Sequence, residues 1–194
     1  MLITNVDVYG LNESIIASGY PMRTDLPCQM ENKMLSFERA IKLGNAESNT
    51  GHNSFMKGII VQFDITYSQA FTPQLQRYKF FEIISSMSKM HRIHKMNFDT
   101  CFNEYVLPDT KVMMMTLQKK YNDNPTKENW NTLLYNCPLG LMLTMRCSTN
   151  YLSLKNIFNQ RKNHKLDEWK DFCKWIIELP RFQQLTGVKF NDDI

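Results

Sequence analysis

The chain has 194 residues, of which 43% are hydrophobic and 22% charged, and its formal net charge is +4. This length is typical of one domain that buries its own core, and the composition excludes a disordered chain. The positive charge is mild and spread along the sequence, so it allows an anionic ligand but does not indicate a dedicated nucleic-acid-binding protein. We therefore expect a single domain over residues 1–194.

The cysteines and the N-terminus indicate a cytoplasmic protein. The number of cysteines is odd and no CxxC pair occurs, which is typical of reduced thiols. Asp7 and Glu13 interrupt the apolar run that a signal peptide needs. No window approaches the roughly 20 apolar residues of a membrane span, so we expect no membrane association. The cysteines are Cys28, Cys101, Cys137, Cys147 and Cys173.

The first half of the chain contains two predicted helices and one strand. Apolar residues at helical spacing predict a helix over residues 31–43, with Gly44 as a suitable C-terminal residue. Alternation of apolar and polar residues over 59–67 predicts a strand with one buried face. The pair Thr72-Pro73 is typical of a helix start, and we expect this helix to continue over residues 72–90.

The second half contains four predicted helical segments and one strand. Residues 108–135 are expected to be helical in two pieces, with a break near 122–125. Alternation over 141–147 predicts a second strand, and two amphipathic helices follow over 150–162 and 166–177. Strands and helices mix without a regular βαβ order, so the fold class is α+β.

The predicted helix over 72–90 has an unusual polar face. A plain amphipathic helix would carry Lys and Glu there, whereas this sector offers an amide, a guanidinium, hydroxyls and aromatic rings. Such a surface suits a planar, anionic ligand, although it also suits packing against a neighbouring helix with a few satisfied polar groups. The residues of this sector are Gln74, Arg77, Tyr78, Phe81, Ser85 and Ser88.

A second polar set lies on the predicted helix over 150–162. Asn150 and Arg161 are about three helical turns apart and fall on nearly the same side, with Asn156 between them. These residues are candidate ligand contacts. Asn150 could equally be only an N-cap, and Arg161 only a partner of the helix dipole.

Together, the two segments resemble the flavin-dependent thymidylate synthases of the ThyX type. That family has a His before a strand, followed by Q-x-x-R-H-R-x-x-S-x-N-E-x-S-x-R-Y, and further along N-x-R-S-L-x-[HN]-x-x-x-x-R. The first pattern is matched in order by His52, Phe55, residues 63–65, Ser68, Gln74 and Arg77. The second pattern is matched by Asn150, Ser153, Leu154, Asn156 and Arg161.

The resemblance implies an α+β fold, with a mixed sheet and packed helices, in a homotetramer whose sites form between subunits. It also implies methylation of the pyrimidine nucleotide dUMP to dTMP, with FAD as cofactor, and folate and NADPH as further partners. Arg161 would be the catalytic residue that polarises the pyrimidine carbonyl, and it would converge with Arg77 on one pocket. The resemblance assigns Arg77, Lys79, Asn150 and Asn156 to FAD, and His52, Gln74, Ser86 and Ser88 to the nucleotide.

The chain departs from the family signature at several positions. Tyr78 stands where the family has its central His, and Lys79 replaces the second Arg. Apolar Ile84 and Leu152 occupy positions that are polar in the family, and Glu82 replaces a Ser. These departures leave a second hypothesis open, in which the chain is a catalytically inactive binding or inhibitor protein of phage type on the same scaffold.

Other kinds of site receive little support. His91 and His94 could share one helix face, but no Asp or Glu lies nearby to complete a metal site, so we expect surface histidines and no bound metal. No glycine-rich phosphate loop is present.

Overall fold

The computed structural model describes residues 1–24, 33–46 and 51–190. The start of the first predicted helix at Glu31, and Cys28, lie outside these residues. Within them, no helix is long and apolar enough to cross a membrane.

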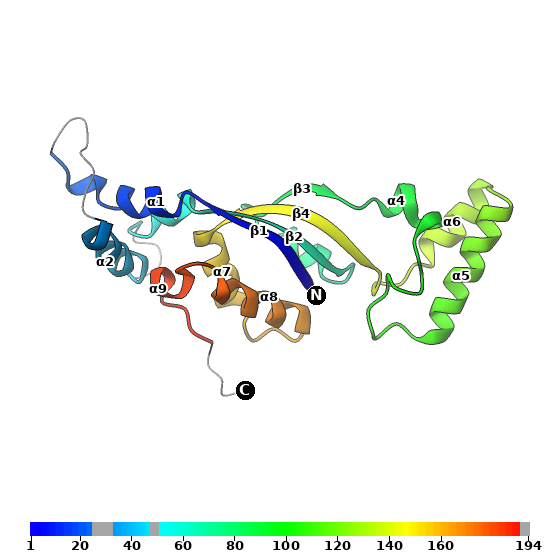
Figure 1. Cartoon of the computed structure of the whole chain (residues 1–194). Helices are drawn as coiled ribbons and strands as arrows, with labels where there is room; N and C mark the ends of the chain where they lie inside the picture. The colour runs from blue at the N-terminus through cyan, green and yellow to red at the C-terminus, as the bar shows by residue number, and fades with distance from the viewer. Residues whose placement is uncertain (25–32, 47–50, 191–194) are drawn as a thin grey trace.

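A four-stranded antiparallel sheet forms the middle of the molecule (Figure 1). Its strands lie in the order β1-β2-β4-β3, so β1 and β3 form the two edges. Together with the helices, this sheet confirms the α+β fold class. The strands are β1 (Leu2–Tyr9), β2 (Ile60–Ser68), β3 (Glu82–Ser86) and β4 (Met142–Asn150).

The predicted alternation of β2 is confirmed. Val61, Phe63, Ile65 and Tyr67 are fully buried, whereas the residues between them are partly exposed. Antiparallel pairing places Cys147 of β4 opposite Phe63, so both central strands bury the same face.

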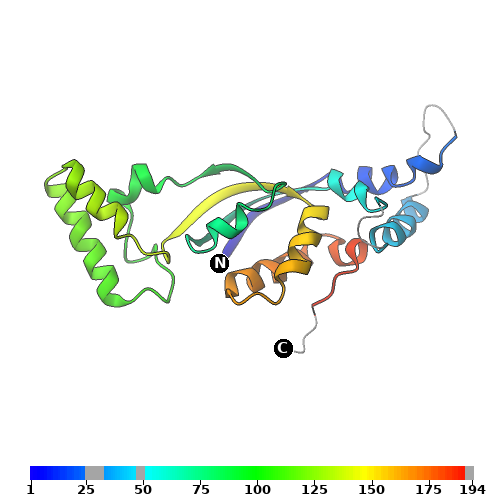
Figure 2. The same cartoon turned by 180° about the vertical axis from the view of Figure 1, so that it is seen from behind.

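The helices are distributed over one face of the sheet and its two ends (Figures 1 and 2). The main core lies between the sheet and α7 and α8, where Trp169 and Phe172 are fully buried. The helices α5 and α6 enclose a second, separate cluster of buried residues. The longer helices are α1 (Leu11–Ala17), α2 (Lys33–Gly44), α5 (Pro108–Asp123), α6 (Lys127–Tyr135), α7 (Tyr151–Arg161), α8 (Asp167–Glu178) and α9 (Phe182–Thr186). The short ones are η1 (Tyr20–Met22), η2 (Ser54–Gly58), α3 (Thr72–Leu75), α4 (Lys89–Arg92) and η3 (Ile93–Lys95).

The prediction of one long helix over residues 72–90 is wrong. The helix α3 ends at Leu75, and residues 82–86 form the edge strand β3 instead. Ile83 and Ile84 are β-branched, and pairing with β4 satisfies the backbone of this segment without a helical turn. The polar sector that included Ser85 and Ser88 therefore does not exist as one helical face.

The strand β1 was not predicted. Its alternation is broken in the middle, where the register with β2 shifts and Asn5 has a φ of 50°. Most of its residues are also exposed, so the strand lacks the apolar stripe by which sequence patterns are recognised.

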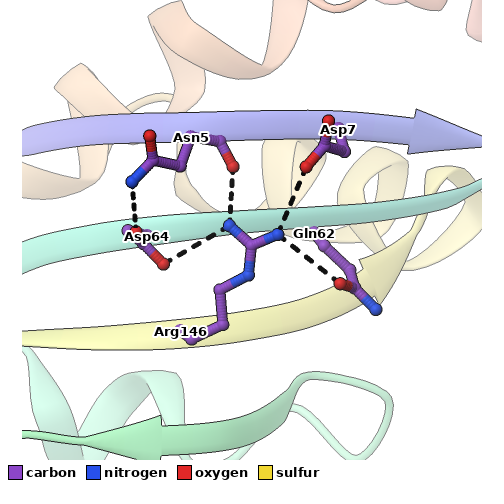
Figure 3. Close-up of polar contacts among 5 residues, drawn as sticks. All are labelled: Asn5, Asp7, Gln62, Asp64 and Arg146. Carbon is purple, nitrogen blue, oxygen red and sulfur yellow. Dashed lines mark hydrogen bonds and ion pairs between the residues drawn. The ribbon is translucent and has the colours of Figure 1, made fainter.

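A polar network on the sheet holds this irregular part of β1 in place (Figure 3). Nη1 of Arg146 donates to the Asn5 carbonyl oxygen at 2.6 Å and lies 3.4 Å from the Asp64 carboxylate. Nη2 of Arg146 lies 3.3 Å from Asp7 and 3.5 Å from the Gln62 side-chain oxygen. One arginine thus connects β4, β2 and both halves of β1.

Candidate functional site

A cavity of about 200 Å³ lies where β2 begins, β4 ends and α7 begins. Ile60 pairs with Asn150, and the Tyr151 N–H donates to the Ile59 carbonyl oxygen at 3.0 Å, which fixes these three elements against one another. The two asparagines that the sequence predicted as cofactor contacts share this cavity. Its lining residues are Lys57, Phe80, Asn150, Leu152, Ser153 and Asn156.

Asn150 is both an N-cap and a cavity residue. Its Oδ1 accepts a hydrogen bond from the Ser153 N–H at 2.9 Å, so the N-cap interpretation is confirmed. Its Nδ2 donates to none of the described residues and remains available to a ligand. Asn156 is exposed and likewise makes no side-chain hydrogen bond within the described part of the chain.

Lys57 and Phe80 were not predicted to belong to this site. The Thr149 Oγ1 donates to the Phe80 carbonyl oxygen at 2.8 Å, and this bond fastens the segment before β3 to the end of β4. The Phe80 side chain nevertheless remains 62% exposed. Lys57 is exposed at the end of η2. Lys57 lies outside both family motifs and Phe80 holds a variable position inside the first one, so only the fold reveals that they meet Asn150.

A second polar group surrounds Arg161, the last residue of α7. Its Nε donates to the Tyr78 hydroxyl oxygen at 2.7 Å, and its Nη1 lies 3.4 Å from the Gln74 side-chain oxygen. The same Gln74 oxygen accepts a hydrogen bond from Trp169 Nε1 at 2.8 Å. The guanidinium carbon lies 4.8 Å from the centre of the buried Trp169 ring, within the range of a cation–π interaction.

Arg161 therefore has a fixed orientation but no counter-charge. No carboxylate of the described residues lies within 4.0 Å of it, and its Nη2 donates to none of them. Burial, together with the positive charge of Arg161, lowers the pKa of His164, so that imidazole is largely neutral at pH 7. Consistently, His164 Nδ1 accepts a hydrogen bond from the Leu166 N–H at 3.0 Å.

The other predicted site residues are more dispersed. Arg77 is exposed, and its side chain forms no hydrogen bond or ion pair with the described residues, whereas Lys79 lies with its Nζ 6.0 Å from the centre of the Phe80 ring. His52 is exposed in the turn before η2. Ser86 is exposed on the edge strand, and Ser88 caps α4 by accepting the His91 N–H at 3.2 Å. The convergence of Arg77 with Arg161 remains a prediction.

A larger cavity, of about 470 Å³, lies between the end of β2, the start of α5 and the start of α8. None of the predicted site residues lines it. Its carboxylates would repel an anionic nucleotide, so we regard the smaller cavity as the better candidate in spite of its size. These carboxylates belong to Glu104, Asp167, Glu168 and Asp171.

The described residues contain no group of three His, Cys, Asp or Glu side chains that could hold a metal ion. His94 packs its ring against Tyr121, with ring centres 5.5 Å apart. The four described cysteines carry free thiols.

Comparison with known proteins identifies the fold. No protein-family model and no curated protein sequence matches the chain. The crystal structure of the flavin-dependent thymidylate synthase ThyX from Helicobacter pylori complexed with FAD and dUMP matches with a TM-score of 0.74 at 17% identity, covering 99% of each chain. A second crystal structure of ThyX from H. pylori with FAD and dUMP matches with a TM-score of 0.69 at 18% identity, covering 96% of this chain and 97% of that one. The resemblance that the sequence suggested is thereby confirmed for the fold: this chain has the fold of the flavin-dependent thymidylate synthases.

Proposed function

We propose that this chain is a ThyX-like protein that binds FAD and a pyrimidine deoxynucleotide and methylates dUMP to dTMP. The observation that carries the proposal is the oriented but unpaired guanidinium of Arg161. A partly buried arginine without a carboxylate partner suits an anionic or electron-rich ligand, because such a ligand supplies the missing charge. Gln74, Tyr78 and Trp169 hold this cation in one orientation before any ligand arrives.

The residues present fit a flavin at the start of α7, in the cavity beside Asn150, and a nucleotide at its end, beside Arg161. Asn150 would hold the flavin through its Nδ2 donor and Asn156 through its side-chain amide, and Arg77 and Lys79 would contact phosphates. A bound reduced flavin would supply the hydride, and methylenetetrahydrofolate the carbon. The role of Arg161 would be to stabilise negative charge that develops on the pyrimidine carbonyl.

Further parts of the proposal follow from the same family resemblance. His52, Gln74, Ser86 and Ser88 would line the nucleotide pocket, NADPH would reduce the flavin, and the protein would work in the cytoplasm as a homotetramer of one-domain chains. The cavity beside Asn150 is smaller than the roughly 300 Å³ at which complete small-molecule pockets begin. Residues of a second copy would therefore complete the site.

The first experiment is a visible spectrum of the purified full-length chain, followed by titration with FAD. A flavoprotein shows absorbance at about 450 nm from the oxidised cofactor. Tritium release from ring-labelled dUMP, measured with reduced FAD present, then tests the reaction itself. A chain that neither copurifies with FAD nor binds it on titration would contradict the proposal.

A second candidate function is the inactive ThyX-scaffold binding or inhibitor protein of phage type. The observation that favours it concerns Tyr78, which stands at the position where the family has a His. The Tyr78 hydroxyl accepts the Nε hydrogen bond of Arg161, so this donor is not available to a ligand. Tritium release separates the two functions. A chain that binds FAD and dUMP but releases no tritium supports the inactive scaffold.

A further inference from the structure

The cavity beside Asn150 combines three kinds of side chain in a small space. Asn150, Asn156 and Ser153 provide polar groups, Phe80 and Leu152 provide apolar surface, and Lys57 provides the one cation among the six lining residues. These residues come from four parts of the chain that the fold brings together: η2, the segment before β3, the end of β4, and α7.

This combination suits a flat ring with carbonyl groups better than it suits a diphosphate. Diphosphate sites use several cations or a row of backbone N–H groups at a helix start. At the start of α7 the Ser153 N–H is already occupied by the cap. A heteroaromatic ring instead stacks on an aromatic side chain and pairs its carbonyl and N–H edges with amides.

We propose that Phe80 and Lys57 are positioning residues for the flavin ring, with Phe80 stacked on its face and the Lys57 ammonium beside its carbonyl edge. This inference rests on the proposed function and adds two residues that no motif position specifies, because Lys57 lies outside the motifs and Phe80 holds a variable position of the first one. Phe80 is suited to stacking because its backbone is held by Thr149 while its ring remains exposed.

The charge of Lys57 would act on the reduced flavin more than on the oxidised one. Reduction concentrates negative charge at the carbonyl edge of the ring, and a cation placed there stabilises the reduced form. No carboxylate of the described residues lies within 4.0 Å of Lys57, so its charge is not neutralised locally. Water screens an exposed ammonium, so we expect an effect of about tenfold on the reduced-to-oxidised ratio, which corresponds to about 30 mV for a two-electron couple.

The test of Lys57 is the reduction potential of the FAD-loaded protein, measured against a reference dye. Lys57→Gln should lower the potential by about 30 mV, and Lys57→Arg should restore it, because the arginine keeps the charge. Lys127→Gln removes an exposed lysine from α6 and is the matched control that should leave the potential unchanged. A potential that is the same in Lys57→Gln and in the wild type would overturn the role of Lys57.

The test of Phe80 is the dissociation constant of FAD, measured by quenching of flavin fluorescence. Phe80→Ala should weaken binding roughly tenfold because one ring-stacking contact is lost, and Phe80→Tyr should bind like the wild type. Tyr135→Ala, which removes an exposed aromatic residue from α6, is the control. A urea midpoint unchanged in Phe80→Ala shows that the fold is intact, and unaltered FAD affinity in that folded variant would refute the stacking role.

The two levels of failure are distinguishable. If the wild-type chain binds no FAD, the proposed function and this inference fail together. If the wild type binds FAD but the Lys57 and Phe80 variants behave as it does, the inference alone fails and the flavin lies elsewhere on the chain.

Discussion

Arg161 shows how single side chains prepare the candidate site. The Gln74 oxygen accepts from both Arg161 and Trp169, so one amide ties the cation to the buried ring over which it lies. Because Trp169 belongs to the main core, the position of Arg161 is coupled to the packing of that core. The cation is thus oriented in the ligand-free chain, and such preorganisation favours electrostatic stabilisation of a developing charge.

We predict that Arg161→Ala reduces turnover of dUMP by about 10²- to 10³-fold, because one preorganised charge near the reacting carbonyl is lost. Bound FAD should remain, since Asn150 and Asn156 lie in a separate cavity. Tritium release and the flavin spectrum of the same preparation measure the two effects. Equal loss of flavin and of turnover would show that Arg161 holds the cofactor instead.

Arg146 is a second single side chain with several partners, and we expect it to contribute to the stability of the fold. We predict that Arg146→Met lowers the free energy of unfolding by about 1–2 kcal/mol, because Asp7 and Asp64 lose their shared counter-charge and Asn5 loses a hydrogen bond. Urea denaturation at constant pH measures this change. Adding Asp64→Asn to the variant should recover part of the loss, because it removes one unpaired carboxylate. Additive losses in the double variant would contradict this account.

At the scale of elements, the junction of β4 and α7 combines capping with ligand binding. We predict that Asn150→Asp keeps the helix start intact, because a carboxylate oxygen also accepts the Ser153 N–H, while FAD binding weakens because the amide donor is lost. Asn150→Ala should weaken FAD binding and also cost about 1 kcal/mol of stability. Urea midpoints and FAD titrations of both variants separate the two roles. If Asn150→Asp binds FAD as the wild type does, Asn150 is only a cap.

The elements that the sequence predicted well are those with one continuous apolar face. The strand β2 and the helix α8 pack against each other in the core. Their buried positions therefore recur at the regular spacing of a strand and of a helix, and apolar residues follow that spacing in the sequence. The edge strand β3 is exposed at all five positions and has no such period, which is why the Thr72-Pro73 start suggested a long helix. Its conformation is determined by pairing with β4, more than fifty residues away, and a local pattern does not contain that information.

The candidate site was predictable to a similar extent. Asn156 and Arg161 lie on α7 and Asn150 caps its start, so the spacing of the three could be recognised in the sequence, and Gln74 could be recognised through its motif. Lys57 and Phe80 reach the cavity through η2 and through the segment before β3. Their positions depend on how β2, β3 and β4 are arranged in the sheet, and the spacing of residues along the sequence does not predict that arrangement.

At the scale of the whole molecule, one edge of the sheet presents apolar surface to solvent. Phe80, Ile84, Met87 and Met90 are each about half exposed or more, and they lie in or beside the edge strand β3. No further strand covers this edge among the described residues. An exposed edge strand with apolar side chains is unfavourable for an isolated chain and typical of a contact between chains.

We predict that the wild-type chain is a homo-oligomer, with a tetramer as the expected state, and that the β3 edge lies in its interface. The small cavity beside Asn150 supports this arrangement, because Phe80 belongs both to the cavity and to the apolar edge. A second copy that covers the edge would therefore also enclose the candidate flavin ring. Light scattering coupled to size-exclusion chromatography at micromolar concentration should show the oligomer, and Ile84→Lys should dissociate it and weaken FAD binding at the same time. Met22→Lys, which places the same charge at an exposed methionine of η1, should do neither. A wild-type monomer would refute the shared site, whereas an oligomer that survives Ile84→Lys would place the interface on another surface of the chain.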